Sequence, residues 1–184
     1  MQSEVDGTDT RRLRLVTLHG HVEGQLRTNL NVSTLHYLNV AAMSRGFVVM
    51  HPPLQTSNGW NVSDGALALA INSVLFVQEV SEYKPVPGDP AAAAAYERRA
   101  IRLSVGDYAV EGFLHVPRGA NPMARLNQDV HAFFALSSVS VLGPNVQFAA
   151  PFLAIKRSKV LAFQAVGIEA ENDEAVEQEM ATTW

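Results

Sequence analysis

Two stretches of the chain carry the same short motifs in the same order. Val22-Glu23-Gly24 recurs 88 positions later as Val110-Glu111-Gly112. Further ordered matches join Arg14-Leu15 to Arg102-Leu103, Leu26 to Leu114, Leu38-Asn39 to Leu126-Asn127, Leu69-Ala70-Ile71 to Leu153-Ala154-Ile155, Val74-Leu75 to Val160-Leu161, and Gln78 and Val80 to Gln164 and Val166. Chance supplies one such match easily but not a collinear series, so the sequence predicts a tandem duplication.

The duplication divides the chain into four predicted segments. We expect a first β-rich repeat at residues 11–80, a linker at 81–97, a second β-rich repeat at 98–166 and a disordered acidic tail at 167–184. The linker contains three prolines and an alanine run, which favour an extended spacer, although the alanines could also begin a helix that carries residues 96–99. Each repeat is small for a domain, so the two copies are expected to pack together, about a pseudo-twofold axis.

Each predicted repeat begins with a β-hairpin and continues into a short helix. Apolar side chains alternate with polar ones around Val22 and again around Val110, the period of a strand with one buried face. Gly106-Asp107 is a favourable two-residue turn. Asn121-Pro122 predicts a helix N-cap followed by proline at the first helical position, and Ser33 is the corresponding cap in the first copy. Two further strands complete each copy, so the predicted fold is mainly β, with two tandem ββαββ small-barrel-like repeats.

The V-E-G strand after a glycine-marked hairpin, the strand from Phe47 to Met50 and the closing segment Ile71-Asn72-Ser73-Val74 resemble the Sm-like small β-barrels, a subset of SH3-like barrels. Ile155 to Val160 repeats the closing pattern. The resemblance implies a small barrel for each copy. The chain departs from that family in placing a helix between its second and third strands, and the family's RNA-contacting loop residues have no clear counterpart. No functional residue is therefore carried over.

Composition excludes several classes of site. The chain has no cysteine, which rules out disulfides, thiolate zinc sites and cysteine nucleophiles. No apolar run approaches the roughly 20 residues that span a bilayer, so we expect no membrane association. The N-terminus from Met1 to Thr10 is acidic and polar, unlike a secretory signal, which leaves a cytoplasmic location as the expectation.

Three sets of polar residues are candidates for chemistry. His19 and His21, with Glu23 and either His36 or His51, could hold a divalent metal if they share one strand face; a solvated strand or a hairpin turn explains them as well. Glu23 and Glu111 recur in both copies and could form a catalytic pair, or could simply bond to neighbouring strand residues. Asn39 and Asn127 also recur, and we expect each to close its helix in the left-handed conformation. The residue pattern supports no catalytic residue and no cofactor.

Charge is distributed unevenly along the chain. Residues 98–166 carry eight basic and three acidic side chains, while residues 167–184 carry six acids and no base. The candidates for binding anions or nucleic acid are Arg98, Arg99, Arg102, Lys156, Arg157 and Lys159, although such runs usually form a solvated face. If this set binds nucleic acid, the acidic tail would compete for it.

Three hypotheses for the function follow from these features. The first is a non-enzymatic binding or assembly module, with a homo-oligomer or another protein as partner, because small β units leave edge strands that invite pairing. The second is nucleic-acid binding through the basic second repeat. The third is a metal-dependent enzyme centred on His19 and His21.

Overall fold

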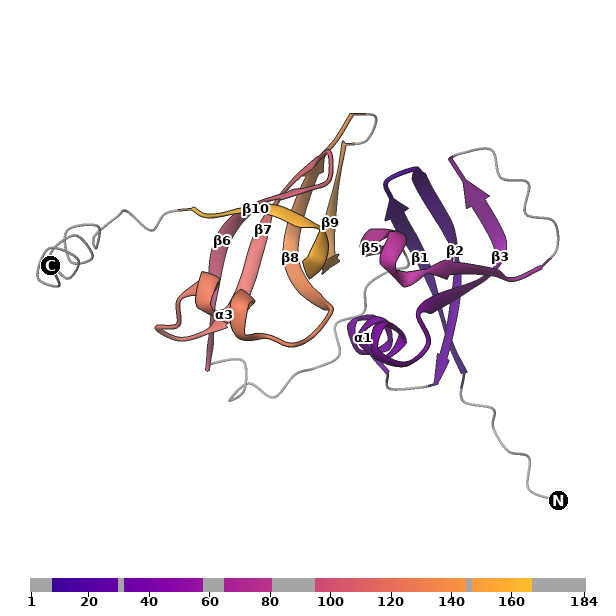
Figure 1. The fold of residues 1–184 in the computed structure, drawn as a ribbon, viewed down its shortest axis with the longest axis horizontal. Helices are drawn as coiled ribbons and strands as arrows, with labels where there is room; N and C mark the ends of the chain where they lie inside the picture. The colour runs from indigo at the N-terminus through magenta and orange to yellow at the C-terminus, as the bar shows by residue number, and fades with distance from the viewer. Residues whose placement is uncertain (1–7, 30–31, 58–64, 81–94, 145–146, 167–184) are drawn as a thin grey trace, which may run out of the picture.

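The computed structural model describes residues 8–29, 32–57, 65–80, 95–144 and 147–166, and within them the protein is mainly β. Ten antiparallel strands form one sheet in the order β10-β6-β7-β8-β9-β5-β1-β2-β3-β4 (Figure 1). The strands are β1 (Thr8–Thr17), β2 (Gly20–Asn29), β3 (Phe47–Thr56), β4 (Leu67–Ala70), β5 (Val74–Glu79), β6 (Tyr96–Val105), β7 (Tyr108–Pro117), β8 (Phe133–Leu142), β9 (Gln147–Lys156) and β10 (Val160–Ala165). The prediction of a mainly β protein is confirmed.

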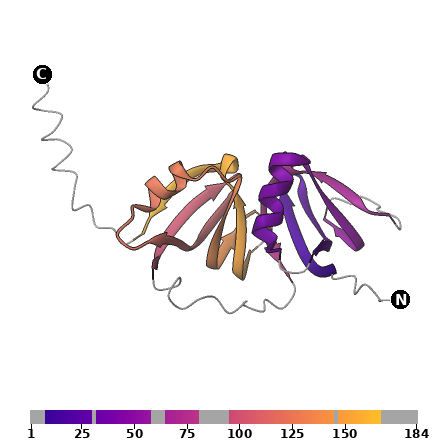
Figure 2. The ribbon, with the colours of Figure 1, turned by 90° about the horizontal axis from the view of Figure 1, so that it is seen from below.

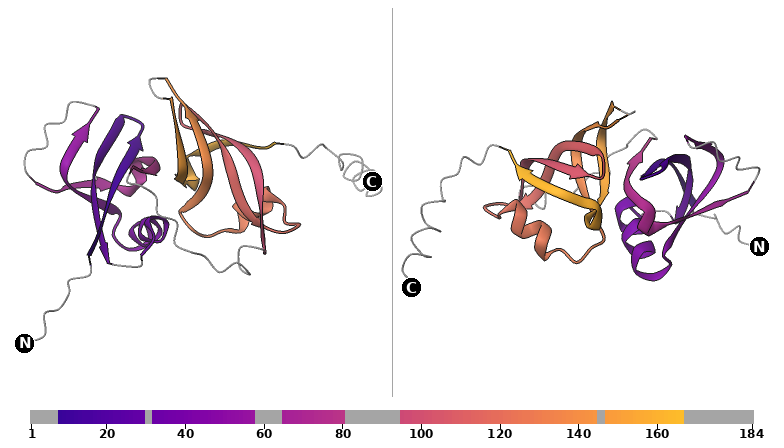
Figure 3. Two further views of the ribbon diagram at one scale, coloured as in Figure 1. Left: turned by 180° about the vertical axis from the view of Figure 1, so that it is seen from behind. Right: turned by 45° about the horizontal axis from the view of Figure 1, so that its top comes forward.

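The described residues form two halves that lie side by side, residues 8–80 and residues 95–166 (Figures 1 and 3). Helix α1 (Thr34–Ser44) belongs to the first half and α3 (Pro122–Gln128) to the second; each half also has a single-turn 3-10 helix before its last strand, η1 (Ile71–Ser73) and η2 (Arg157–Lys159). Both halves run strand, strand, helix, strand, strand, 3-10 turn, strand. In both, the sheet order is fifth, first, second, third and fourth strand.

A glycine lies in or directly after the turn of each hairpin. In the second half the strands end at Val105 and resume at Tyr108, so Gly106 and Asp107 make the turn, and the φ of Gly106 is +58°. A positive φ is favourable for glycine because it has no Cβ. In the first half Leu18 and His19 make the turn before Gly20. The predicted hairpins are therefore confirmed, and the apolar positions that alternate along them point into the core.

The predicted helix starts are also confirmed. The Ser33 hydroxyl accepts a hydrogen bond from the backbone N–H of His36 at 3.1 Å. The Asn121 side chain accepts one from the N–H of Met123 at 2.8 Å, and Pro122 is the first helical residue. Each cap satisfies a backbone donor that has no partner inside the helix, so the helix starts where the sequence places the capping side chain.

The alignment of the two fourth strands differs from the sequence match. Phe47 lies opposite Ala70 in the β3–β4 ladder, and Phe133 lies opposite Lys156 in the β8–β9 ladder. Ala70 therefore corresponds to Lys156 and not to Ala154, and the match of Leu69-Ala70-Ile71 with Leu153-Ala154-Ile155 was wrong by two positions. Equivalent residues of the two halves are 88 positions apart up to the start of the helix and 86 apart from the third strand onward. The second half has two fewer residues between the start of its helix and its third strand.

Two boundaries in the structure differ from the predicted ones. β6 begins at Tyr96, so residues 96 and 97, assigned to the linker, belong to the second half, and the helix considered for residues 96–99 is a strand. β1 begins at Thr8, before the predicted start at residue 11. The rest of the linker, residues 81–94, and the acidic tail, residues 167–184, lie outside the described residues.

The sheet is open, and the halves do not meet about a twofold axis. β4 and β10 stand at the two ends of the strand order and each pairs with one described strand. The halves join where β5 pairs with β9, with Phe76 opposite Ile155 and Gln78 opposite Leu153. Under a twofold axis the pairing of β5 with β9 would be repeated by a pairing of β4 with β10, which stand at opposite ends of the strand order. The fifth strand of one half instead meets the fourth strand of the other, so the predicted pseudo-twofold arrangement is not confirmed. Of the two forms considered for each repeat, a small barrel or an open sheet, the strand order shows a sheet that is not closed.

The hydrophobic core crosses this junction. Val16, Leu75 and Phe76 of the first half pack into the cluster that fills the second half. Phe133 and Ala154 of the second half pack into the cluster of the first. Because each half completes the other's core, the β5–β9 junction is part of the folded unit and not a loose contact between separate domains.

Candidate functional site

The two histidines proposed as metal ligands lie at the β1–β2 hairpin. His19 is in the turn, where its backbone N–H donates to the Thr17 hydroxyl at 3.2 Å, and His21 is the second residue of β2. Burial, and then the charge of Arg14, lower the pKa of His21, while Glu23 opposes them. Across the described ranges, no three His, Asp or Glu side chains gather into a group that could hold a metal ion.

The six predicted anion-binding residues each have separate surroundings. Arg99 pairs with Glu97 at 2.7 Å and Arg102 with Glu111 at 2.7 Å. Both arginines are thus neutralised by carboxylates on β6 and β7. Arg157 and Lys159 lie in η2, and Arg157 is 3.5 Å from Asp129.

Lys156 is buried at the junction between the halves. Its ammonium donates to the carbonyl oxygen of Ile71 at 3.0 Å and to the side chain of Asn72 at 2.9 Å. Burial, and then the nearby charge of Lys159, lower the pKa of Lys156. These contacts hold β9 against η1 of the first half, so Lys156 stabilises the junction instead of facing solvent.

The two recurring glutamates make the same contact in each half. Glu23 accepts from the Nε of Arg14 at 2.6 Å, and Glu111 accepts from the Nε of Arg102 at 2.7 Å. Their surroundings differ, because the Glu23 side chain is 7% exposed and also accepts from Arg12, while the Glu111 side chain is 54% exposed. Each carboxylate has its own arginine partner and neither lines the large cavity described below. The contacts match the strand-pairing alternative for these residues.

This difference predicts unequal losses of stability. Glu23→Gln should lower the free energy of unfolding by about 1–3 kcal/mol, because hydrogen bonds between charged groups are lost in a buried setting. Glu111→Gln should cost less than about 1 kcal/mol, as for other exposed ion pairs. Urea denaturation of both variants measures the two values. Equal losses would show that burial does not decide the strength of this pair.

The recurring asparagines do not end their helices. Asn39 is in the middle of α1 and buried; its amide donates to the carbonyl oxygen of Phe133 at 3.2 Å and accepts from the Phe133 N–H at 2.8 Å. Asn127 is inside α3 and exposed, and the residue that caps α3 is Asp129 with a φ of −72°. The predicted left-handed helix ends were wrong. Asn39 instead binds the backbone of the other half, a partner 94 residues away that no local pattern could reveal.

Helix α1 lies at the boundary between the halves, next to strands of the second half (Figure 2). A cavity of about 820 Å³ opens there, between α1 and the face of β6 to β9. Its α1 side presents Leu35, Val40 and Met43, and its strand side presents Ala135 and Phe152. Its polar groups include Arg98, His115, Ser137 and Ser138 on the strands and Arg125, Asp129 and His131 around α3. Of the residues that the sequence singles out, Arg98 lines it, as do His36, one of the alternative metal ligands, and Asn39.

The strand side of the cavity carries a connected polar cluster. His115 Nε2 and the Ser137 hydroxyl are 2.8 Å apart, and Arg98 donates to the Ser138 hydroxyl at 3.1 Å. Arg98 and His115 are opposite each other in the β6–β7 ladder. Burial, and then the Arg98 charge, lower the pKa of His115, which favours the neutral form of its imidazole. No sequence motif marks this cluster, because three neighbouring strands contribute to it.

Comparison with known proteins gives no relative for the chain: no family model, curated protein or solved structure matches it. Among the described residues, neither helix has the length and apolar character needed to cross a membrane.

Proposed function

We propose that the protein is a non-enzymatic assembly module, a duplicated small β unit whose copies join head to tail through β10 of one molecule and β4 of the next. The observation that carries the proposal is the pairing of β5 with β9 inside one chain. β10 holds the same place in the second half as β5 in the first, and β4 holds the same place as β9. The two strands at the ends of the sheet are therefore the counterparts of the two that already pair.

Equivalent hydrogen bonds support the duplication. The Ile71 N–H donates to Gly46 O at 2.8 Å, and the Arg157 N–H donates to Ala132 O at 2.9 Å, 86 residues later. A second equivalent pair of hydrogen bonds lies just after the last strand of each half. The Val80 N–H donates to Arg12 O at 2.8 Å, and the Val166 N–H donates to Ala100 O at 2.9 Å. The repeated Arg14–Glu23 and Arg102–Glu111 contacts add a third. Backbone contacts recur even where the side chains differ, as expected for two copies of one fold.

The exposed apolar side chains support the position of the interface. Leu161 on β10 is 73% exposed, whereas its counterpart Leu75 on β5 is 1% exposed inside the second half. Phe47 on β3 is 51% exposed, whereas its counterpart Phe133 is 1% exposed beneath α1. The junction between the halves thus buries two apolar side chains whose counterparts are exposed near the two ends of the sheet. A neighbouring copy would bury them and remove two unpaired strand edges.

An interface between unlike edges has a consequence for the size of the assembly. Each molecule would use β10 toward one neighbour and β4 toward the other, so the interface is not self-complementary. Such contacts repeat until the assembly closes into a ring or extends as a filament. The side-chain amide of Asn127 on α3 fits the same geometry. It would bond to the backbone of Phe47 in the next copy, as the amide of Asn39 bonds to the backbone of Phe133 within the chain.

Light scattering during size-exclusion chromatography tests the proposal. We expect wild-type protein to form multiples of the chain mass, with Leu161→Lys and Phe47→Lys each reducing the assembly because each places a charge in one side of the interface. The control is Leu142→Lys, an exposed leucine at the end of β8, which should assemble like wild type. Circular dichroism verifies that all three variants fold.

Mixing the two edge variants distinguishes the geometry. Each retains one intact side, so Leu161→Lys and Phe47→Lys together should form a one-to-one complex that grows no further. A twofold dimer through β10 would instead leave Phe47→Lys dimeric by itself. A monomeric wild type at high concentration, or assembly of Leu161→Lys like wild type, would refute the head-to-tail module.

A further inference from the structure

The cavity beside the junction is separate from the surfaces assigned to assembly. It lies within one chain, and none of its lining residues belongs to β4 or β10. Its volume of about 820 Å³ falls within the range of small-molecule sites, roughly 300–1,000 Å³. The cavity therefore has room for a ligand whether or not copies of the chain associate.

Within the described part of the chain, Arg98 is the cation of this cavity that has no acidic partner. Its guanidinium lies over the Phe113 ring at 4.1 Å and donates to the Ser138 hydroxyl, and no carboxylate of the described residues is within 4.0 Å of it. Arg99 and Arg102 on the same strand both pair with glutamates. Neutral groups thus hold the Arg98 guanidinium in place and leave its charge available to an anion.

The backbone beside Arg98 is unusual. Ser138 has a φ of +49°, and it is the one non-glycine residue in the described part of the chain with a positive φ. The left-handed conformation is unfavourable for serine and is retained where the surrounding structure needs it, often at binding sites. Here it occurs where the β7–β8 register shifts, and it accompanies the placement of the Ser138 hydroxyl against Arg98.

The fold itself does not require this polar cluster. By the offsets of 88 and 86, the first half has Thr10, Arg27, His51 and Pro52 at the positions of Arg98, His115, Ser137 and Ser138. The first half forms the same strands with these different residues. The cluster is therefore present in one half only and is not needed to form these strands.

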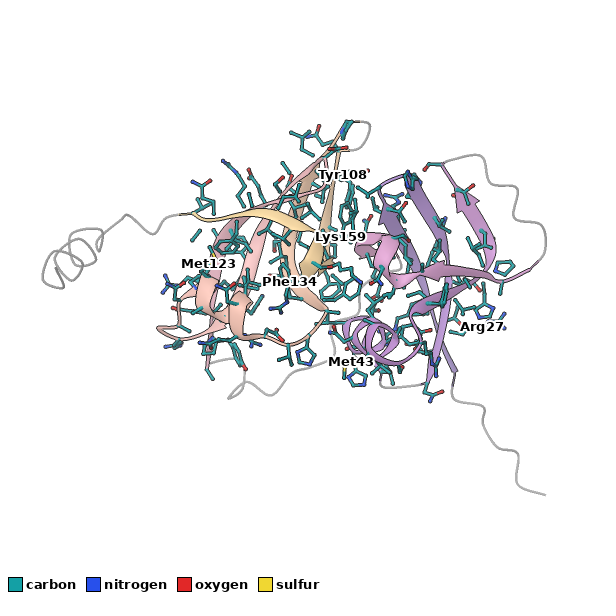
Figure 4. The ribbon with its side chains drawn as sticks, viewed as in Figure 1. Arg27, Met43, Tyr108, Met123, Phe134 and Lys159 are labelled. Carbon is teal, nitrogen blue, oxygen red and sulfur yellow. The ribbon has the colours of Figure 1, made fainter. Side chains whose placement is uncertain are left out.

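The rest of the cavity is favourable for the apolar part of an anion. Val40 and Met43 on α1 are exposed at 42% and 83%, and they line the cavity together with Ala135 and Phe152 of the strands. The cavity's acid, Asp129, already contacts His131 at 2.6 Å and Arg157 at 3.5 Å, so its charge is compensated. Figure 4 shows Met43 projecting from α1 at the boundary between the halves.

We propose that this cavity binds an amphiphilic carboxylate, a molecule with one oxyanion and an aliphatic body. The oxyanion accepts hydrogen bonds from Arg98 and the Ser138 hydroxyl, next to the His115–Ser137 pair. The aliphatic body lies along Val40 and Met43, where it covers apolar side chains that the protein otherwise leaves in water. The site is distinct from the assembly surface and does not depend on it.

Isothermal titration calorimetry with decanoate, below its micelle concentration, tests the site. We expect saturable one-to-one binding, weakened at least about tenfold by Arg98→Gln, because a charge-assisted hydrogen bond contributes at least about 1.4 kcal/mol. Arg118→Gln is the matched control, an exposed arginine outside the cavity whose loss should leave the affinity unchanged. Met43→Glu should weaken binding as well, by placing a like charge beside the aliphatic body.

Two further probes separate the head from the body. Decanol keeps the body without the charge and acetate keeps the charge without the body, so each should bind much more weakly than decanoate. Absence of decanoate binding to the wild type would overturn the proposal. So would equal affinities of decanoate for wild type and Arg98→Gln, provided that thermal melts show both to be folded.

Discussion

Replacing Phe133 with alanine is expected to lower the free energy of unfolding by about 3–5 kcal/mol, the usual cost of removing a buried phenyl group and leaving a cavity. Phe133 is fully buried in the core of the first half, although it belongs to the second. Its loss therefore affects both halves together. Chemical denaturation followed by near-ultraviolet and by far-ultraviolet circular dichroism should give one coincident transition with a lower midpoint.

Phe47→Ala is the matched control for this substitution. Phe47 has the same place in its own half but is half exposed, so its removal should cost the isolated molecule less than about 1 kcal/mol. In the proposed assembly Phe47 is covered by the next copy, and the same substitution should reduce the mass of the assembly. A loss as large as that of Phe133→Ala would show that the two phenylalanines are not equivalent.

Asn39→Ala is expected to cost about 2–5 kcal/mol of unfolding free energy. The amide of Asn39 satisfies both the N–H and the carbonyl oxygen of Phe133 in a buried position. Removing the amide leaves two polar groups without partners, and each costs about 1–3 kcal/mol. Urea denaturation measures the loss, and hydrogen exchange at the Phe133 amide should accelerate relative to amides in the hairpin β6–β7.

Asn127→Ala distinguishes the two asparagines. Asn127 is exposed on α3, so the stability of a single molecule should change by less than about 0.5 kcal/mol. The assembly should weaken, because Asn127 is the residue proposed to bind the backbone of Phe47 in the next copy. A stability loss equal to that of Asn39→Ala would contradict this assignment, and unchanged assembly would remove Asn127 from the proposed interface.

Local features of the fold could be predicted because neighbours in sequence produce them. Gly106-Asp107 forms a turn through the backbone freedom of glycine and the short span of the hairpin. Asn121 and Ser33 begin their helices because each side chain reaches a backbone donor two or three residues away. The alternation of apolar residues around Val22 and Val110 identifies strands for a similar reason, since it depends on adjacent positions alone.

The errors concern contacts between distant segments. Asn39 was assigned to a helix end because an asparagine near a helix is usually a cap, but its partner is on a strand of the other half. Lys156 belonged to a predicted basic set, yet it is buried against η1. The offset of the fourth strands was misjudged because Leu, Ala and Ile recur in almost any buried strand, whereas the ladders determine the register.

The sequence by itself determined that the chain would form strands with a small helix in each half, where the second hairpin turns and where the helices begin. The tertiary structure alone decided that β5 meets β9, that β4 and β10 remain at the ends, and that Arg98, His115 and Ser138 converge on one cavity. The physical reason is the separation in sequence between the residues that interact. Caps, turns and alternation depend on residues a few positions apart, while strand partners are selected by packing across the whole chain, which one sequence does not display.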